Sequence, residues 1–418
     1  MKILWITNIM LPPLCEALSL PVPPVGGWMY SSLKKLRRKD CTNTFAVATV
    51  WQGASLKRVE VDNVIYYLLP LKGRNKKKYQ QSLEPQWSLI KAEFKPDIVH
   101  IHGTEFPFGL AYINSCGAAG VVASIQGIIS GIARYYASGI SRVNVKKRLT
   151  FRDFIKHDSI IQQQNEFHAR GKLEAELFKR LHHVIGRTDW DKDHALALNP
   201  TIRYHFCGET LREEFYKHKW KYSDCKPYSI FVSQAGYPIK GLHMLLKAMP
   251  LILDKYPDAK IYVAGADIIN IPWYRISGYG RYLKLLIKKL DLSDRIIFTG
   301  PLDEHRMCEY YLKSNVFVCP SSIENSPNSL GEAQLLKMPH IASFVGGVPE
   351  IVNWNSNILY RFEEYEMLAQ KICRIFENKD RFIDISDLSR YDAANNCRQL
   401  LGIYKEIYNS KILDRTSL

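Results

Sequence analysis

The residues best suited to chemistry lie between Val316 and Val352. Glu324 and Glu332 are separated by seven residues, and Glu332 falls on an expected apolar helix. Further on, Gly346-Gly347 end a second buried run, and Pro349-Glu350 follow after one residue. In an open parallel sheet ligands bind outside the carboxyl ends of the strands. We therefore expect both carboxylates, which accept strongly from hydroxyl groups, to line one cleft. The simpler alternative is a pair of solvated surface charges.

This Glu-x7-Glu spacing before a GG-x-PE segment resembles the donor site of retaining GT-B glycosyltransferases, family 4 (group 1) in particular. The resemblance implies an α/β protein of the GT-B fold, with two Rossmann-like doubly wound domains facing a cleft. It also implies transfer of a sugar from a UDP- or GDP-sugar with retention of configuration, without a cofactor or metal. Glu324 would then act as the catalytic residue beside the donor sugar, and Glu332 would bind the ribose hydroxyls.

The segment QAGYPIKG at Gln234–Gly241 is similar to the family pattern G-R-x-x-x-x-K-G, whose two cations hold the diphosphate. Lys240 matches the lysine, although alone it would usually be a solvated helix start. Ala235 stands where the arginine is usual, so one cation is missing or comes from elsewhere, and Arg187 is a candidate. The resemblance also places Gly300 near the nucleotide base.

Between the glutamates most family members have Gly-Phe-Gly, whereas this chain has Asn325-Ser326-Pro327-Asn328. Because Pro327 has no N–H to donate, phosphate and sugar contacts are expected to shift to Asn328 and Ser329. This departure affects the identity of the donor sugar more than the type of reaction.

In the first half, Gly26 and Gly27 follow the first expected strand and precede a helix. Adjacent glycines let backbone N–H groups approach a phosphate, although an ordinary Pro/Gly loop has the same composition. The resemblance puts this loop over the donor. It also makes His102, at a strand's carboxyl end, and Gln126, where many members have histidine, possible sugar or acceptor contacts.

Asp189 and Asp191 form a DxD pattern, which in another glycosyltransferase fold binds a metal and a nucleotide diphosphate. Here they open an expected helix, where aspartate is a good N-cap. We therefore favour capping by Asp191 over metal binding.

The length of 418 residues predicts more than one domain. We expect an N-terminal acceptor-side domain over residues 1–222, a nucleotide-sugar domain over 226–394 and a C-terminal helix, 395–418, packed back on the first domain. The expected strands lie at Ile3–Thr7, Phe45–Val50, Val64–Leu69, Asp97–His102, Val121–Ile125, Val184–Arg187, Arg203–Cys207, Tyr228–Ser233, Lys260–Ala264, Ile296–Thr299, Val316–Cys319 and Ile341–Val345, with helices between most of them. The longest helical region is expected at Val143–Leu181.

The formal net charge is +16, and basic residues cluster at Lys34–Lys39, Lys72–Lys78 and Arg142–Lys156. Such clusters suit anionic lipid or a polyanion, or merely keep a protein soluble. With the resemblance, they predict a lipid-linked saccharide acceptor at an anionic membrane, in the assembly of capsule, exopolysaccharide or O-antigen, and no nucleic-acid partner.

Nine cysteines without a CxxC pair and an N-terminus unlike a signal peptide predict a cytoplasmic protein, peripheral on the inner face of the membrane. Two alternatives stay open: a nucleotide-sugar 2-epimerase or a phosphorylase of the same fold, and a basic non-catalytic protein that binds nucleic acid or membrane. Salt-sensitive DNA binding without nucleotide-sugar binding would favour the second.

Overall fold

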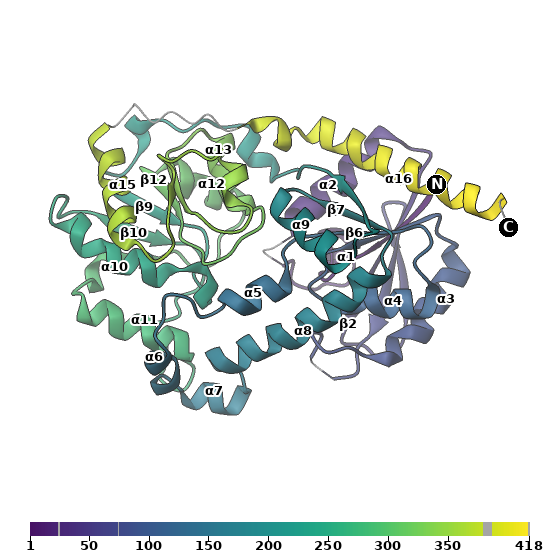
Figure 1. The fold of residues 1–418 in the computed structure, drawn as a ribbon, viewed down its shortest axis with the longest axis horizontal. Coiled ribbons are helices and arrows are strands. Elements are labelled where there is room, and N and C mark those ends of the chain that lie inside the picture. The colour runs from purple at the N-terminus through teal and green to yellow at the C-terminus, as the bar shows by residue number, and fades with distance from the viewer. Residues whose placement is uncertain (24–25, 74, 379–386, 417–418) are drawn as a thin grey trace. The chain divides into compact units, whose positions relative to one another are not determined.

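The structure is a computed structural model that describes residues 1–418 except 24–25, 74, 379–386 and 417–418. The chain forms two compact units, each with its own sheet (Figure 1). Unit 1 comprises Met1–Ser130, His168–Thr210 and Ser389–Leu418, and unit 2 comprises Gly131–Phe167 and Leu211–Leu388.

The sheet of unit 1 has the strand order β3-β4-β2-β1-β5-β6-β7-β8. All its pairs are parallel except β3 with β4. The strands are β1 (Lys2–Ile6), β2 (Thr44–Trp51), β3 (Lys57–Val61), β4 (Val64–Pro70), β5 (Ile98–His102), β6 (Val121–Ser124), β7 (His183–Gly186) and β8 (Arg203–Phe206). Strand β3 was not predicted, because its sequence KRVEV is mostly charged and forms an exposed edge. The chain changes direction across the sheet between β1 and β5.

Successive residues of β1 and β2 point to opposite faces of this sheet, and each face has an apolar core. Leu4 and Ala46 pack on one side with α3 (Glu84–Phe94), α4 (Phe108–Cys116) and the end of α8 (Ile160–Arg180). Trp5 and Phe45 pack on the other side with α2 (Gly27–Lys39) and α16 (Ala393–Thr416). The remaining helices that lie wholly in unit 1 are α1 (Pro12–Ala17) and α9 (Asp189–Leu198).

The sheet of unit 2 has the strand order β11-β10-β9-β12-β13-β14, and all its pairs are parallel. The strands are β9 (Ser229–Val232), β10 (Lys260–Val263), β11 (Ile296–Phe298), β12 (Val316–Cys319), β13 (His340–Ser343) and β14 (Leu359–Tyr360). This is the order of a dinucleotide-binding fold, in which the chain reverses direction across the sheet between its first and fourth strands. The carboxyl ends of β9 and β12 are therefore the expected ligand site.

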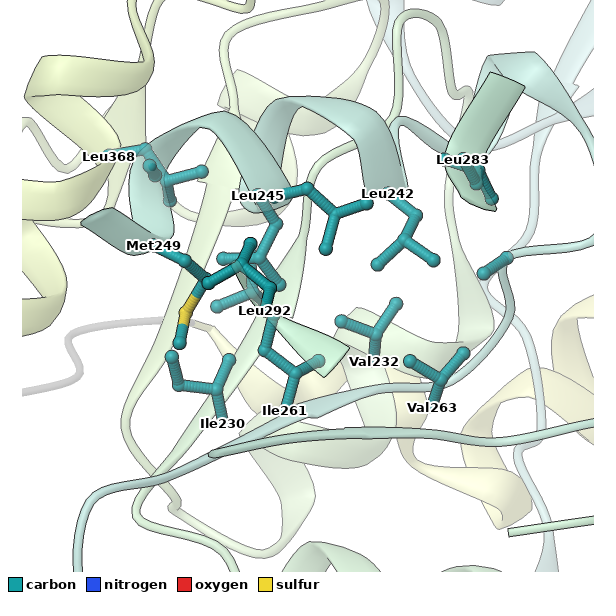
Figure 2. Packing of buried hydrophobic residues seen from close by; sticks show 14 of the residues in the cluster. Ile230, Val232, Leu242, Leu245, Met249, Ile261, Val263, Leu283, Leu292 and Leu368 are labelled. Atoms are coloured by element: carbon teal, nitrogen blue, oxygen red, sulfur yellow. The ribbon is translucent and has the colours of Figure 1, made fainter. Parts of the chain in front are cut away.

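Helices cover both faces of the second sheet. On one face α10 (Leu242–Leu253), α11 (Gly278–Lys289) and α15 (Tyr365–Asn378) contribute to a large apolar cluster. Figure 2 shows Leu242, Leu245 and Met249 of α10 packed over Ile230 and Val232 of β9. On the other face Phe231 and Phe317 pack against α12 (Glu304–Leu312) and α13 (Asn328–Leu335). The helix α14 (Val348–Ile351) follows the Gly-Gly turn.

Residues 131–167 belong to unit 2, which corrects the predicted range of 1–222 for the first domain. Tyr136, Ile140 and Ile160 are buried in the apolar cluster of unit 2. The single helical region predicted at Val143–Leu181 is in fact α6 (Arg142–Lys147), α7 (Phe151–Lys156) and α8, which follow α5 (Ile129–Tyr135). Thr150 caps the start of α7, and His157 with a φ of 51° ends it, so the helix cannot continue.

The C-terminal helix α16 packs in unit 1 through a row of buried residues, of which Tyr404 makes hydrogen bonds. Tyr404 accepts a hydrogen bond from the indole of Trp5 at 3.1 Å and lies 2.6 Å from Nδ1 of His100. Nε2 of His100 contacts the Ser124 hydroxyl at 2.7 Å. Burial lowers the pKa of His100 to about 3 and keeps the ring neutral. His100 is thus a hydrogen-bonded core residue.

None of the helices in the described residues has both the length and the apolar character required to span a bilayer.

Replacing Tyr404 by phenylalanine should destabilise unit 1 by about 1–3 kcal/mol, because Trp5 and His100 then lose a buried partner. Urea unfolding followed by circular dichroism measures the loss. Tyr408→Phe, on the same helix but half-buried, is the matched control and should change the free energy of unfolding by less than about 0.5 kcal/mol. Equal midpoints for the two variants would contradict the role given to the Tyr404 hydroxyl.

Candidate functional site

The loops after β9 and β12 are packed against each other at the carboxyl edge of the second sheet. Lys240 ends a 3-10 turn, Pro238–Lys240, and Gly241 follows with a φ of 66°. A side chain at Gly241 would overlap the carbonyl oxygen of Pro320, which follows β12. Both the backbone conformation and the close approach require glycine. The Lys-Gly pair therefore fixes where the lysine side chain starts.

Lys240 and Glu324 form an ion pair within unit 2. Nζ of Lys240 lies 2.6 Å from Oε1 of Glu324, and the hydroxyl of Ser321 donates to the same oxygen at 2.8 Å. Burial lowers the pKa of Lys240, but the Glu324 carboxylate outweighs that effect, so the pKa is raised overall. The two side chains stay 22% and 14% exposed, so a ligand can still reach them.

Glu332 is held by an arginine that the sequence analysis did not single out. Nε and Nη2 of Arg212 donate to the two oxygens of Glu332, each at 2.6 Å. Burial raises the pKa of Glu332, and the charge of Arg212 opposes the shift. Arg212 also lies over the Phe215 ring, with its guanidinium 4.8 Å from the ring centroid. Unit 2 thus places a second cation beside the predicted donor glutamates.

The start of α13 leaves backbone donors for a ligand. Pro327 is the N-cap residue and makes no side-chain cap hydrogen bond. Asn328 and Ser329, predicted to contact phosphate or sugar, occupy the first two positions of the helix, whose N–H groups have no partner within the helix. A helix start of this kind favours anions.

The Gly-Gly turn after β13 contacts the backbone carbonyl group of Glu324. Gly346 has a φ of 51°, and a side chain there would overlap the carbonyl oxygen of Glu324. The N–H of Gly347 donates to that carbonyl at 3.1 Å. The two motifs that carried the resemblance are therefore in direct backbone contact. Gly300, predicted near the base, follows β11 and forms an isolated bridge with Gly265.

Arg187 lies in unit 1 and is paired there. Its Nη2 is 3.2 Å from Oε1 of Glu209, and its Nη1 donates to the carbonyl of Ile125 at 3.3 Å. Its side chain is 7% exposed. Of the two candidate cations, only Arg212 shares a unit with Lys240, Glu324 and Glu332.

The aspartates of the DxD pattern stabilise a helix start. The hydroxyl of Thr188 accepts from the N–H of Asp191, so Thr188 is the N-cap of α9 and the predicted cap at Asp191 is displaced by three residues. Asp191 accepts from the N–H of Arg187 at 2.9 Å and from the Tyr204 hydroxyl at 2.6 Å. Among the described residues, no group of three or more His, Cys, Asp or Glu side chains could hold a metal ion.

At the carboxyl edge of the first sheet several polar atoms are buried without a hydrogen-bond partner among the described residues. They include both ring nitrogens of His102, Nε2 of Gln126 and Oε2 of Glu105. Burial holds the pKa of His102 well below its usual range, so the ring is neutral, and raises that of Glu105 to about 7. Glu105 was missed because it falls in a loop without a recognisable pattern.

The Gly26-Gly27 pair opens α2 in the same unit. Gly26 is the N-cap residue with a φ of 84°, and Gly27 begins the helix with open space where a side chain would stand. The predicted access of backbone N–H groups to a ligand is consistent with this geometry.

Residues 194–391 match the family model described as "Glycosyl transferases group 1". The chain is 27% identical over 212 residues to spore coat protein SA of Bacillus subtilis, covering 48% of this chain and 53% of that protein. It is 31% identical over 183 residues to an uncharacterized glycosyltransferase of Methanocaldococcus jannaschii, covering 42% and 44%. The chain thus spans about half the length of these curated relatives.

Solved structures are similar over almost the whole chain. Sucrose-phosphate synthase from Thermosynechococcus elongatus superimposes with a TM-score of 0.63 at 16% identity, covering 99% of this chain and 98% of that one. The Anabaena protein HepE in complex with UDP-glucose gives a TM-score of 0.58 at 14% identity, covering 100% of both chains. The chain therefore has the GT-B fold, and its residues 194–391, just under half of the chain, are similar to glycosyltransferase group 1.

Proposed function

We propose that this protein moves a sugar from a UDP- or GDP-sugar to a hydroxyl of a lipid-linked saccharide, with retention of configuration, in the assembly of a surface polysaccharide. The observation that carries the proposal is the pair of ion pairs, Lys240–Glu324 and Arg212–Glu332, at the carboxyl edge of a dinucleotide-type sheet. The group 1 family match and the fold shared with HepE, which was solved with UDP-glucose, support it.

In this proposal the nucleoside diphosphate replaces one partner in each ion pair. A diphosphate accepts from the Lys240 ammonium, the Arg212 guanidinium and the N–H groups at the start of α13. Glu332 is then freed to accept from the ribose hydroxyls. Because a buried carboxylate that loses its cation is costly, the hydroxyl groups of the ribose and of the donor sugar must in turn donate to Glu332 and Glu324.

Glu324 is proposed to lie beside the sugar that is transferred. Positive charge develops on the sugar as the glycosidic bond breaks, and a carboxylate stabilises that charge in the transition state. The leaving diphosphate, neutralised by Lys240 and Arg212, accepts negative charge at the same time and can take the proton of the acceptor hydroxyl. No metal ion or cofactor is part of this proposal.

The basic clusters and the lipid-linked acceptor support a cytoplasmic location at the inner face of a membrane, where anionic lipid attracts lysine and arginine. This location is part of the proposal and is independent of the chemistry at Glu324.

A screen of UDP- and GDP-sugars for binding and slow hydrolysis tests the proposed reaction. We expect one donor to bind and to be hydrolysed slowly in the absence of an acceptor. With an acceptor saccharide, NMR of the product should show the anomeric configuration of the donor. An inverted product would refute retention, and binding of no nucleotide sugar together with salt-sensitive binding of DNA would refute the proposal as a whole.

Arg212→Lys should weaken nucleoside diphosphate binding about tenfold, because lysine keeps the charge but cannot form the bidentate hydrogen bonds of a guanidinium group. Lys240→Ala should weaken it by about 1.5–3 kcal/mol, the range for a charged hydrogen bond. Calorimetric titration measures both effects. Arg187→Lys, in unit 1, is the matched control and should bind as the wild type does. If only Arg187→Lys lost affinity for the nucleoside diphosphate, Arg187 and not Arg212 would be the second cation that binds it.

The two glutamates should differ in their kinetics. Glu332→Gln should raise the donor KM and weaken nucleoside diphosphate binding in parallel, because the ribose does not react. Glu324→Gln should lower kcat strongly and leave nucleoside diphosphate affinity nearly unchanged, because its contribution grows in the transition state. Steady-state kinetics with circular dichroism as a folding control separates the two effects. If Glu324→Gln lost affinity and kept kcat, the assignments would be reversed.

A further inference from the structure

Unit 2 exposes a group of large apolar side chains around the short helix α7. Phe154 is 74% exposed and Trp273 is 72% exposed, against the usual burial of such residues. The other members are about half exposed or more: Val143, Leu149, Phe151, Ile155 and Tyr274. We call residues 142–156 together with 273–275 the apolar–basic patch.

The helix α7 is amphipathic, but its apolar face points to solvent and a charged residue points inward. Phe151, Phe154 and Ile155 stand at positions i, i+3 and i+4, so they share one face, and all three are exposed. The buried member of the helix is Asp153, which is 1% exposed. A soluble protein normally turns the apolar face of a helix inward, so this face is built for a partner that is itself apolar.

Hydrogen bonds and a ring contact hold the patch in place on unit 2. Thr150 and Asp153 form a capping box at the start of α7. Asp153 also accepts from the N–H of Gly278, at the start of α11, at 3.2 Å. Arg281 donates to the carbonyl of Leu149 at 3.1 Å, and the rings of Phe151 and Trp273 are 5.8 Å apart. Figure 1 shows α6 and α7 beside α11. The exposure is therefore part of a fixed arrangement.

Positive charge surrounds these apolar groups. Residues 142–156 contain six cations, Arg142, Lys146, Lys147, Arg148, Arg152 and Lys156, and one acid, the buried Asp153. Arg152 is paired with Asp158 at 2.8 Å. Arg275 adds a further exposed cation beside Tyr274, with its guanidinium 5.9 Å from the ring centroid.

We infer that the apolar–basic patch inserts into the surface of an anionic bilayer. Tryptophan and tyrosine favour the membrane–water interface, and a basic rim is attracted to acidic headgroups. A second copy of this chain would bring two cationic rims together, so charge disfavours self-association. The inference deepens the proposed function, since a lipid-linked acceptor lies at such a surface. It locates docking in one of the three basic clusters, the one that also carries exposed apolar side chains.

Vesicle binding of the full-length protein tests the inference. The wild type should bind vesicles of phosphatidylcholine with phosphatidylglycerol and should bind phosphatidylcholine alone much more weakly. Phe154→Ser and Trp273→Ser should each reduce binding about tenfold or more, because each variant loses the free energy gained when a large apolar side chain moves from water into the bilayer. Lys146→Gln with Lys147→Gln should reduce binding at low salt and have little effect at high salt.

Matched controls separate the patch from general hydrophobicity and charge. Trp354→Ser and Leu251→Ser remove exposed apolar side chains of unit 2 outside the patch and should bind as the wild type does. Lys77→Gln with Lys78→Gln, in a basic cluster of unit 1, should weaken binding less than Phe154→Ser does. Brominated lipid should quench the fluorescence of the bound wild type more than that of Trp273→Phe.

Three results would overturn the inference: no vesicle binding by the wild type, equal binding by Phe154→Ser and the wild type, or self-association in solution that Phe154→Ser abolishes. Donor hydrolysis without vesicles should be unchanged in every patch variant. If the wild type bound vesicles but no nucleotide sugar, the proposed function would fail while the docking surface would stand.

Discussion

The site depends on one constraint, that a buried carboxylate needs a cation beside it. An unpaired charge in the interior costs several kcal/mol, and unit 2 holds one buried carboxylate, Glu332, and one largely buried carboxylate, Glu324, at the same sheet edge. Lys240 stabilises Glu324 and Arg212 stabilises Glu332, each at 2.6 Å. The first pair joins the loop after β9 to the loop after β12. The second joins the segment before Phe215 to α13. The glycines at 241 and 346 permit the close backbone approach on which the first pair depends.

The same constraint links stability to function. A site made of paired charges keeps its carboxylates and cations oriented before a ligand arrives, and pre-orientation lowers the cost of binding. A nucleoside diphosphate presents anionic groups for the cations, and its sugars present hydroxyls for the carboxylates. In the proposed function the ligand therefore exchanges partners with the pairs, so that every cation and every carboxylate keeps a hydrogen-bonding partner.

The sequence predicted much of the fold because its strands are apolar, short and bounded by turns, which local patterns reveal. It predicted Lys240, Glu324 and Glu332 because their spacing falls in recognisable motifs. Arg212 could not be predicted, since it lies in an irregular loop 120 residues before Glu332 and is brought there only by tertiary packing. The assignment of residues 131–167 to unit 2 was missed for a similar reason. An amphipathic pattern shows that a helix has an apolar face, but not which core receives it. The pattern at Phe151–Ile155 even points outward, which periodicity alone cannot distinguish from a buried face.

The central claim is that the carboxyl edge of the second sheet binds the nucleotide part of a sugar donor. Hydrogen–deuterium exchange of the whole protein, with and without UDP or GDP, tests this most directly. We predict that one of the two nucleotides slows exchange in residues 234–242 and 324–335, which carry Lys240, both glutamates and the start of α13. Slower exchange confined to other segments, or no change with either nucleotide at saturating concentration, would contradict it.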